Sequence, residues 1–84
     1  MKATHIVVIQ SGWVFVGTLH PTPAPGTMRL DNAACIRQWG TTRGLGELAL
    51  SGAQKATELD PCGTVEAVLS AVLFTIPVDP KKWK

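Results

Sequence analysis

The first twenty residues contain two short apolar segments separated by a turn signal. Thr4 to Gln10 is rich in β-branched residues, which favour strands. Ser11-Gly12 is typical of a two-residue hairpin loop, and Trp13 to Leu19 follows as a second strand-like segment. In Trp13 to Leu19 both alternating sets of side chains are largely apolar. This pattern predicts a strand buried on two faces rather than one with a solvated face.

Proline interrupts the pattern before a third strand begins. Residues 20–27 include three prolines at alternate positions, which remove backbone donors and favour an exposed, extended connection. Met28 to Leu30 starts again as strand. Asp31-Asn32 predicts a turn or bulge, because Asx side chains mimic backbone turns and tolerate left-handed conformations. Ala33 to Trp39 then returns to strand.

A change to helical spacing after residue 40 predicts one short helix. Thr41 or Thr42 is expected at the N-cap. Three apolar residues at i, i+3, i+4 spacing follow within 45–49, and Gly52 is expected to end the helix in a left-handed conformation. Two turns of helix are not stable alone, so this helix must pack on the sheet.

The last third of the chain leaves several local structures open. Gln54 to Leu59 is a candidate short polar strand, and Asp60-Pro61-Cys62-Gly63 predicts a turn. Thr64 to Val78 is the longest apolar run. It is compatible with one long bent strand, with two strands that meet near Leu69-Ser70, or with a strand after a short helical turn. Pro77 places the end of this run at a sheet edge or terminus.

Together these patterns predict a single α+β domain over residues 1–84, with residues 81–84 as a basic tail. We expect a small, mainly antiparallel β-sheet or partly open barrel of five to six strands with one short helix. Hydrophobic residues make up 45% of the 84 residues and charged residues 17%, against about 25% charged in an ordinary soluble protein. A small core and few surface charges favour burial of apolar surface against other copies of the chain. We therefore expect a homo-oligomer.

Charge and cysteine content argue against several classes of function. The net charge is +2, and three of the eight cationic residues lie in the last four positions. Duplex nucleic acid is therefore an unlikely partner, because its binding domains carry larger basic stripes. Two cysteines without a CxxC or Cys/His cluster indicate no metal and no cofactor. The N-terminal apolar run is short for a signal peptide and no run reaches the roughly 18 residues of a membrane span, so we expect a cytoplasmic protein with reduced thiols.

The segment from Arg37 to Ala49 concentrates the candidate chemistry. Arg37 and Arg43 carry guanidinium groups that match phosphate or carboxylate, Trp39 can stack on a base, and Thr42 adds a hydroxyl. Backbone N–H groups near the helix start would favour an anion. The alternative is that Trp39 is a core residue, the glycines form a tight turn and the arginines are solvated. The spacing matches no standard phosphate loop.

Two further tryptophans are candidates for stacking on a ligand. Trp13 lies on a strand face where core packing is the alternative, and Trp83 stands between lysines, where folding back on its own domain is the alternative. No sequence rule pairs His5 or His20 with a serine or cysteine nucleophile. We therefore expect a protein that is not an enzyme and has no catalytic residue.

The chain resembles small β-rich proteins encoded by tailed bacteriophages and prophages, and the resemblance covers nearly its whole length. The matching segments are Trp13 to Leu19, Leu30-Asp31-Asn32-Ala33 with Trp39-Gly40, Gly44 to Ala49 with Gly52, Asp60-Pro61-Cys62, and Phe74 to Val78. Small phage proteins without an enzymatic signature often act against host defences. The resemblance thus implies a non-enzymatic anti-defence homo-oligomer in the bacterial host cytoplasm, which binds and sequesters a nucleotide-derived immune signal.

Two other functions stay open at this point. One is a protein-binding inhibitor or accessory factor that docks on a host or virion protein, through an exposed strand edge or the apolar 64–78 segment. The other is a nucleic-acid-binding accessory protein, whose affinity would fall steeply with salt.

Overall fold

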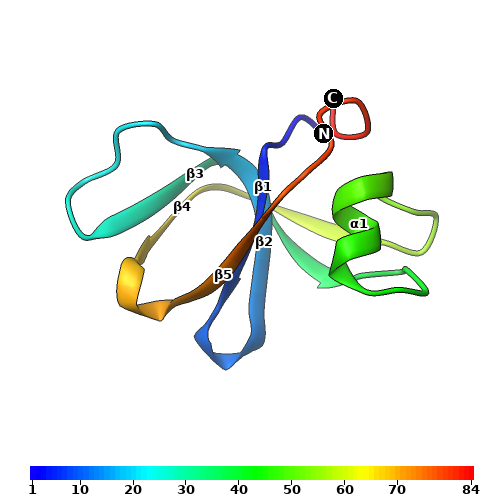
Figure 1. Ribbon diagram of the computed structural model, residues 1–84, viewed down its shortest axis with the longest axis horizontal. Helices are drawn as coiled ribbons and strands as arrows, with labels where there is room; N and C mark the ends of the chain where they lie inside the picture. The colour runs from blue at the N-terminus through cyan, green and yellow to red at the C-terminus, as the bar shows by residue number, and fades with distance from the viewer.

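The computed structural model describes residues 1–84 and contains one five-stranded antiparallel sheet with a short helix packed on one face (Figure 1). The predicted α+β class, mainly antiparallel with one short helix, is confirmed. The elements are β1 (His5–Ile9), β2 (Trp13–Leu19), β3 (Thr27–Gln38), α1 (Leu45–Ser51), β4 (Glu58–Val68) and β5 (Val72–Pro77), with one-turn 3-10 helices η1 (Gln10–Gly12) and η2 (Leu69–Ala71). No helix is long and apolar enough to cross a membrane.

The strands are ordered β4-β3-β2-β1-β5, so β4 and β5 are the two edges of the sheet although they follow one another in the chain. Only η2 separates them, and in Figure 1 this orange turn lies at one end of the molecule. The sheet must therefore curl strongly to bring its edge strands together at that end. Elsewhere both edges remain without a partner strand.

The predicted hairpin is confirmed, but its loop has three residues, Gln10–Gly12, rather than the predicted two. β1 and β2 pair from His5↔Gly17 to Ile9↔Trp13, and the intervening turn is η1. Ser11 and Gly12 both have positive φ, at 73° and 82°. Two consecutive left-handed residues are what a tight hairpin of this twist requires.

The third strand is longer than the pattern predicted. Met28 to Leu30 and Ala33 to Gln38 belong to one continuous strand, β3, rather than to two segments, and Trp39, predicted as strand, lies just beyond its end. The predicted irregularity at Asp31-Asn32 is confirmed as a bulge: the pairing with β4 shifts between Leu30 and Ala33, and Asn32 has a φ of 47°.

The predicted turn at residues 60–63 is wrong, because these residues lie inside β4. They form a bulge in which Ala33 pairs with Gly63 while Ala34 pairs with Pro61. Proline is tolerated there because β4 is an edge strand and the bulge needs no regular donor. The predicted polar strand at 54–59 is also wrong for most of its length, since β4 begins only at Glu58.

The apolar 64–78 run adopts the second of its three predicted forms. It divides into two strands that meet at η2, and Pro77 ends β5 at the sheet edge, as predicted.

The helix lies where the residue spacing predicted it, but its N-cap is neither Thr41 nor Thr42. Gly44, with a φ of 82°, is the N-cap and provides no side-chain hydrogen bond. The Thr41 hydroxyl instead donates to the Gly44 carbonyl at 2.8 Å, and the Thr42 hydroxyl donates to Glu47 at 3.0 Å. Gly52 ends the helix at a φ of 83°, as predicted.

The sheet has two very different faces. The covered face packs against α1 and the C-terminal segment. It buries twelve residues: Ala3, Ile6, Val8, Val14, Val16, Ala34, Ile36, Leu45, Leu48, Ala49, Val78 and Trp83.

The other face, called the open face from here on, has no helix over it. Its core contains four buried residues, Val7, Met28, Leu30 and Ala33, with Ile9, Phe15, Val65, Ala67 and Val72 partly buried around them. Within the chain, this face is covered only by the curled strands β3 and β4.

Candidate binding surfaces

Arg37 lies near the end of β3 and is already paired with carboxylates of β4. Its Nε donates to Asp60 Oδ2 at 2.9 Å, and its Nη2 lies 3.3 Å from Glu58 Oε2. The side chain is 63% exposed. Two carboxylates on one guanidinium leave little positive charge to attract a phosphate.

Trp39, Thr42 and Arg43 lie in the loop before α1. Trp39 is 44% exposed, and its ring lies against Gly44, where an added Cβ would be 3.5 Å from the indole. Glu47 Oε1 accepts hydrogen bonds from the Thr42 hydroxyl at 3.0 Å and the Arg43 backbone N–H at 3.1 Å. The protein's own carboxylate therefore uses donors that an anion would need. The Arg43 guanidinium forms no ion pair.

Trp13 lies on the open face, away from that loop. The β2–β3 pairing ends at Phe15↔Cys35, and alternation along each strand places Trp13 and Arg37 on the same face of the sheet as that pair. The sequence-predicted residues thus fall into three groups. Trp13 and Arg37 share the open face. Trp39, Thr42 and Arg43 share the loop, and Trp83 stands alone.

Trp83 belongs to the core of the covered face. It is 2% exposed, and its Nε1 donates to the Leu48 carbonyl at 3.0 Å. Its backbone carbonyl also accepts from the Ala3 N–H at 3.2 Å. Stacking on a ligand would require the chain end to leave this core.

A groove on the open face, here called the Trp13 groove, has a volume of about 400 Å³. Its lining residues are Ile9, Trp13, Phe15, Val65, Glu66 and Ala67. Trp13 is 58% exposed, and its ring stacks on Phe15 with 6.4 Å between centroids and 14° between planes. No local sequence pattern predicts this groove, because it forms only where Val65 and Ala67 of β4 come near Trp13 and Phe15 of β2.

The β5 edge is the most apolar part of the exposed surface. We use this name for β5, the η2 turn before it and Val68 at the end of β4, with four exposed hydrophobic residues: Val68, Leu69, Leu73 and Phe74. Leu73 is 58% and Phe74 52% exposed. No charged residue occurs between Glu66 and Asp79.

The backbone of β5 presents free hydrogen-bonding groups at this edge. The Val78 N–H donates to the Thr4 carbonyl at 2.9 Å. In the antiparallel register with β1, Ile76 and Phe74 then also direct backbone groups toward β1, and those of Thr75 point outward. Pro77 has no N–H to offer, so the free edge ends there.

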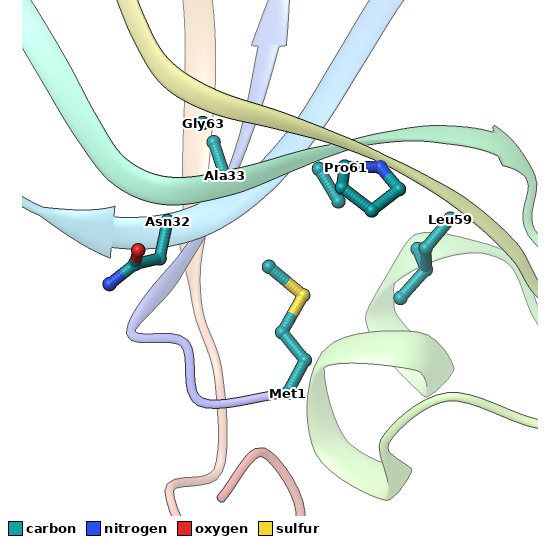
Figure 2. Close-up of a pocket in the computed structure, with 7 residues that line it drawn as sticks. Met1, Asn32, Ala33, Leu59, Pro61 and Gly63 are labelled. Atoms are coloured by element: carbon teal, nitrogen blue, oxygen red, sulfur yellow. The ribbon is translucent and has the colours of Figure 1, made fainter.

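A second pocket of about 390 Å³ lies between the bulges of β3 and β4. Figure 2 shows the Met1 side chain extending toward Ala33 and Pro61, with Leu59 at one side and Asn32 at the other. No titratable side chain lines this pocket. Its chemistry is therefore limited to apolar contact and one amide.

The structure joins two residues that the sequence analysis treated separately, His20 and Asp31. His20 Nδ1 lies 2.9 Å from Asp31 Oδ2, and Arg29 Nε donates to Asp31 Oδ1 at 2.8 Å. The hydrogen bonds from His20 and then Arg29 hold the pKa of Asp31 below its ordinary value. The signal for this cluster was the strand register, in which Thr18 faces Asp31.

This cluster has the order hydroxyl, imidazole, carboxylate, since the Thr22 hydroxyl lies 3.5 Å from His20 Nε2. That contact is at the limit of a hydrogen bond. None of His20, Thr22 and Asp31 lines either pocket. Its evident role is to fasten the start of the proline-rich connection to β3.

The two thiols differ in exposure. Cys35 is half-buried and Cys62 exposed, and both are free. Burial raises the pKa of the Cys35 thiol, and the neighbouring Cys62 and Asp60 add to the effect. No group of three His, Cys, Asp or Glu side chains is arranged to hold a metal ion.

Comparison with known proteins gives no relative: no family model and no curated protein matches this chain. Its function must therefore be argued from its own surfaces.

Proposed function

We propose that this protein is a non-enzymatic binding protein that docks on another protein through the β5 edge. The observation that carries the proposal is an uncharged edge strand with Leu73 and Phe74 more than half exposed. The resemblance to phage proteins suggests a host or virion protein as the partner, met in the bacterial cytoplasm.

An edge strand of this kind is unusual unless something covers it. Proteins that remain monomeric protect their edges with lysine, proline, bulges or covering loops. Here Pro77 guards one end, a register shift lies between Val8 and Ile9 of the neighbouring strand, and no lysine lies along β5. A partner strand can pair with the outward backbone of Thr75 and bury Leu73 and Phe74. Full burial of such a side chain contributes roughly 1.5–3 kcal/mol.

The experiment places a photo-crosslinking amino acid at position 73 and, as a matched control, at position 50. Leu50 is 67% exposed on α1, so both leucines are more than half exposed but lie on different surfaces. In a bacterial lysate we expect position 73, and not position 50, to crosslink one protein stoichiometrically. Thr75→Pro should abolish the crosslink because it removes an outward N–H that β1 does not use. Equal labelling from both positions would refute the proposal.

The same experiment tests self-association. A crosslinked species of twice the chain mass from position 73 would overturn this proposal, because it would assign the β5 edge to a second copy in the expected homo-oligomer. A species of any other single mass would assign it to a different protein.

Sequestration of a nucleotide-derived signal is the second candidate. In its favour, Trp39 is exposed and Arg43 carries an unpaired guanidinium in the same loop. Against it, Arg37 and the loop donors are already used by Glu58, Asp60 and Glu47. Calorimetric titration with cyclic dinucleotides and trinucleotides tests it: binding that Arg43→Ala removes would support it, and absence of heat from every ligand would exclude those signals.

A further inference from the structure

We infer that Cys35 and Cys62 are a redox modification site, at which a small-molecule disulfide drives formation of a reversible disulfide bond between β3 and β4. They are the only two cysteines of the chain, and both thiols are free. Neither lies on the β5 edge, so this site does not depend on the proposed function. Where protein thiols are normally kept reduced, a disulfide of this kind is transient and acts as a redox sensor.

Both thiols lie on the open face of the sheet. In β3, Ile36 belongs to the core of the covered face, so strand alternation directs its neighbour Cys35 to the open face. In β4, Leu59 packs against the same covered core. Alternation therefore directs Asp60, and Cys62 two residues further on, to the open face as well.

The strand register makes the two cysteines diagonal neighbours. Cys35 pairs with Asp60, and Cys62 is displaced from that pair by two residues along β4. Diagonal neighbours in a regular ladder lie about 7–8 Å apart. A disulfide joins residues whose Cα atoms are about 4.4–6.8 Å apart. A regular ladder would therefore hold the two thiols slightly too far apart for a bond.

The bulge in β4 allows the remaining movement. Ala34 pairs with Pro61 and Ala33 pairs with Gly63, so Cys62 is the extra residue of the bulge and has no partner in the ladder. Its backbone can shift toward β3 without breaking a pair between the two strands. Because β4 is an edge strand, no strand on its other side opposes that shift.

The two thiols influence one another and differ in reactivity. Burial raises the pKa of the Cys35 thiol, and charge on Cys62 is the next contribution. Cys62 is exposed, whereas Cys35 is half-buried. Thiolate character and exposure decide which thiol reacts, so Cys62 reacts first and Cys35 second.

The reaction is two successive thiol–disulfide exchanges. The Cys62 thiolate attacks one sulfur of the small disulfide, a mixed disulfide forms, and the other half of the reagent leaves as a thiolate. The Cys35 thiolate then attacks Cys62 Sγ, the bond between the two cysteines forms, and the second half leaves as a thiolate. The protein loses two electrons and two protons. The reagent gains the electrons, and its two thiolates or the solvent take up the protons.

The test incubates the whole chain with oxidised glutathione at pH 8 and follows its intact mass. We expect a glutathione adduct first, and then a monomer two hydrogen atoms lighter than the starting chain. Cys35→Ala should stop at the adduct, because the second nucleophile is missing. Cys62→Ser should form neither the early adduct nor the lighter monomer.

A matched control keeps two thiols and moves the exposed one to the other face of β4. Val65 belongs to the core of the open face, so alternation directs the exposed residue Thr64 away from that face. The double variant Cys62→Ser/Thr64→Cys should still form the adduct. It should close the intramolecular bond at least about tenfold more slowly than the parent chain, because the two sulfurs are no longer positioned to meet.

The closed form should also fit the folded sheet. We expect its thermal midpoint to lie several degrees above that of the dithiol, because the bond restricts the unfolded chain. Dithiothreitol should restore the original mass and midpoint. A parent chain that stops at the adduct or forms only a species of twice the chain mass would overturn the inference. Equally fast closure in the control, or a closed form that melts below the dithiol, would overturn it as well.

Discussion

The covered and open faces are built from the same strands yet reach very different degrees of burial. In β1, Ile6 and Val8 point to the covered face, and Val7 and Ile9 to the open face. Both sets are apolar. One set meets α1 and Trp83, whereas the other meets only the curl of the sheet. A strand that is apolar on both sides has two faces that need contacts. In this chain only one of the two faces is covered by a separate layer, formed by α1 and the C-terminal segment.

The largest expected difference between the two faces is in how much a substitution on each lowers the stability of the fold. Leu48 is fully buried between α1 and the sheet, so Leu48→Ala should lower the free energy of unfolding by about 2–5 kcal/mol. Trp13→Ala, on the open face, should cost under about 1 kcal/mol although it removes a larger side chain. Equilibrium urea denaturation of both variants measures this. Equal losses would mean that the open face is as tightly packed as the covered one.

A smaller effect isolates one bond of the covered face. Trp83→Phe keeps a buried aromatic ring but leaves the Leu48 carbonyl without the indole donor. We expect a loss of roughly 0.5–1.5 kcal/mol, because one buried hydrogen bond is lost while the Leu48 carbonyl keeps the Gly52 N–H as a donor at 3.0 Å. Thermal unfolding measures it, with Trp39→Phe as the matched control. If both substitutions lowered the midpoint equally, Trp83 would have no special place in the core.

The edge of the sheet should tolerate charge where the core would not. Leu73→Asp and Leu50→Asp replace leucines of similar exposure, so each should change stability by only about 0.5 kcal/mol. Only Leu73→Asp should abolish the crosslink at the β5 edge, here read from a probe at position 69. Loss of the crosslink in both variants would point to a general effect of charge.

The stability of the fold should depend on acid pH through Asp31 and its partners His20 and Arg29, rather than through either core. The pKa of Asp31 is lower in the folded protein than in the unfolded chain, so its pairing with His20 and Arg29 stabilises the fold above the ordinary carboxyl pKa. That contribution is lost as pH falls through the lowered pKa, below about pH 4. Melting temperatures from pH 2 to 6 should fall less steeply in Asp31→Asn than in the parent chain, with Glu66→Gln as control. Parallel curves for parent and Asp31→Asn would contradict this.

The smallest predicted difference is between the two thiols. Cys62 is exposed, whereas Cys35 is half-buried on the open face and its pKa is raised by burial. At pH 8, a disulfide reagent should modify Cys62 first and Cys35 several-fold more slowly. Cys62→Ser should leave only the slow phase. A single fast phase for both would mean that the open face is looser than the structure indicates.

Local features of the sequence were sufficient for much of the fold. Ser11-Gly12 specified the hairpin because two adjacent positive φ values need small, turn-forming residues. The bounds of β2 agreed with its apolar run. The turn predicted at Asp60 to Gly63 failed because a proline and a glycine can also form a bulge, and that choice depends on pairing with β3 some 30 residues earlier.

The candidate surfaces were less predictable, since they depend on contacts distant in sequence. Nothing near Arg37 in the chain indicates that Glu58 and Asp60 will neutralise it. Trp83, predicted within a basic tail, is buried in the core of the covered face and donates to the Leu48 carbonyl of α1, a contact between residues 35 positions apart. An edge strand within 64–78 was foreseen from composition and Pro77, because lack of charge and a missing donor are local properties.

The hydrogen bond between Ala3 and Trp83 also fixes how the molecule can be attached to anything else. Because this bond joins the two ends of the chain, they emerge side by side, and in Figure 1 they lie opposite the tip of the β1–β2 hairpin. A tether at either end would therefore leave the hairpin directed away from the support. The same proximity makes the chain suited to circular permutation, with the ends joined and new ends opened in the exposed proline-rich connection before β3.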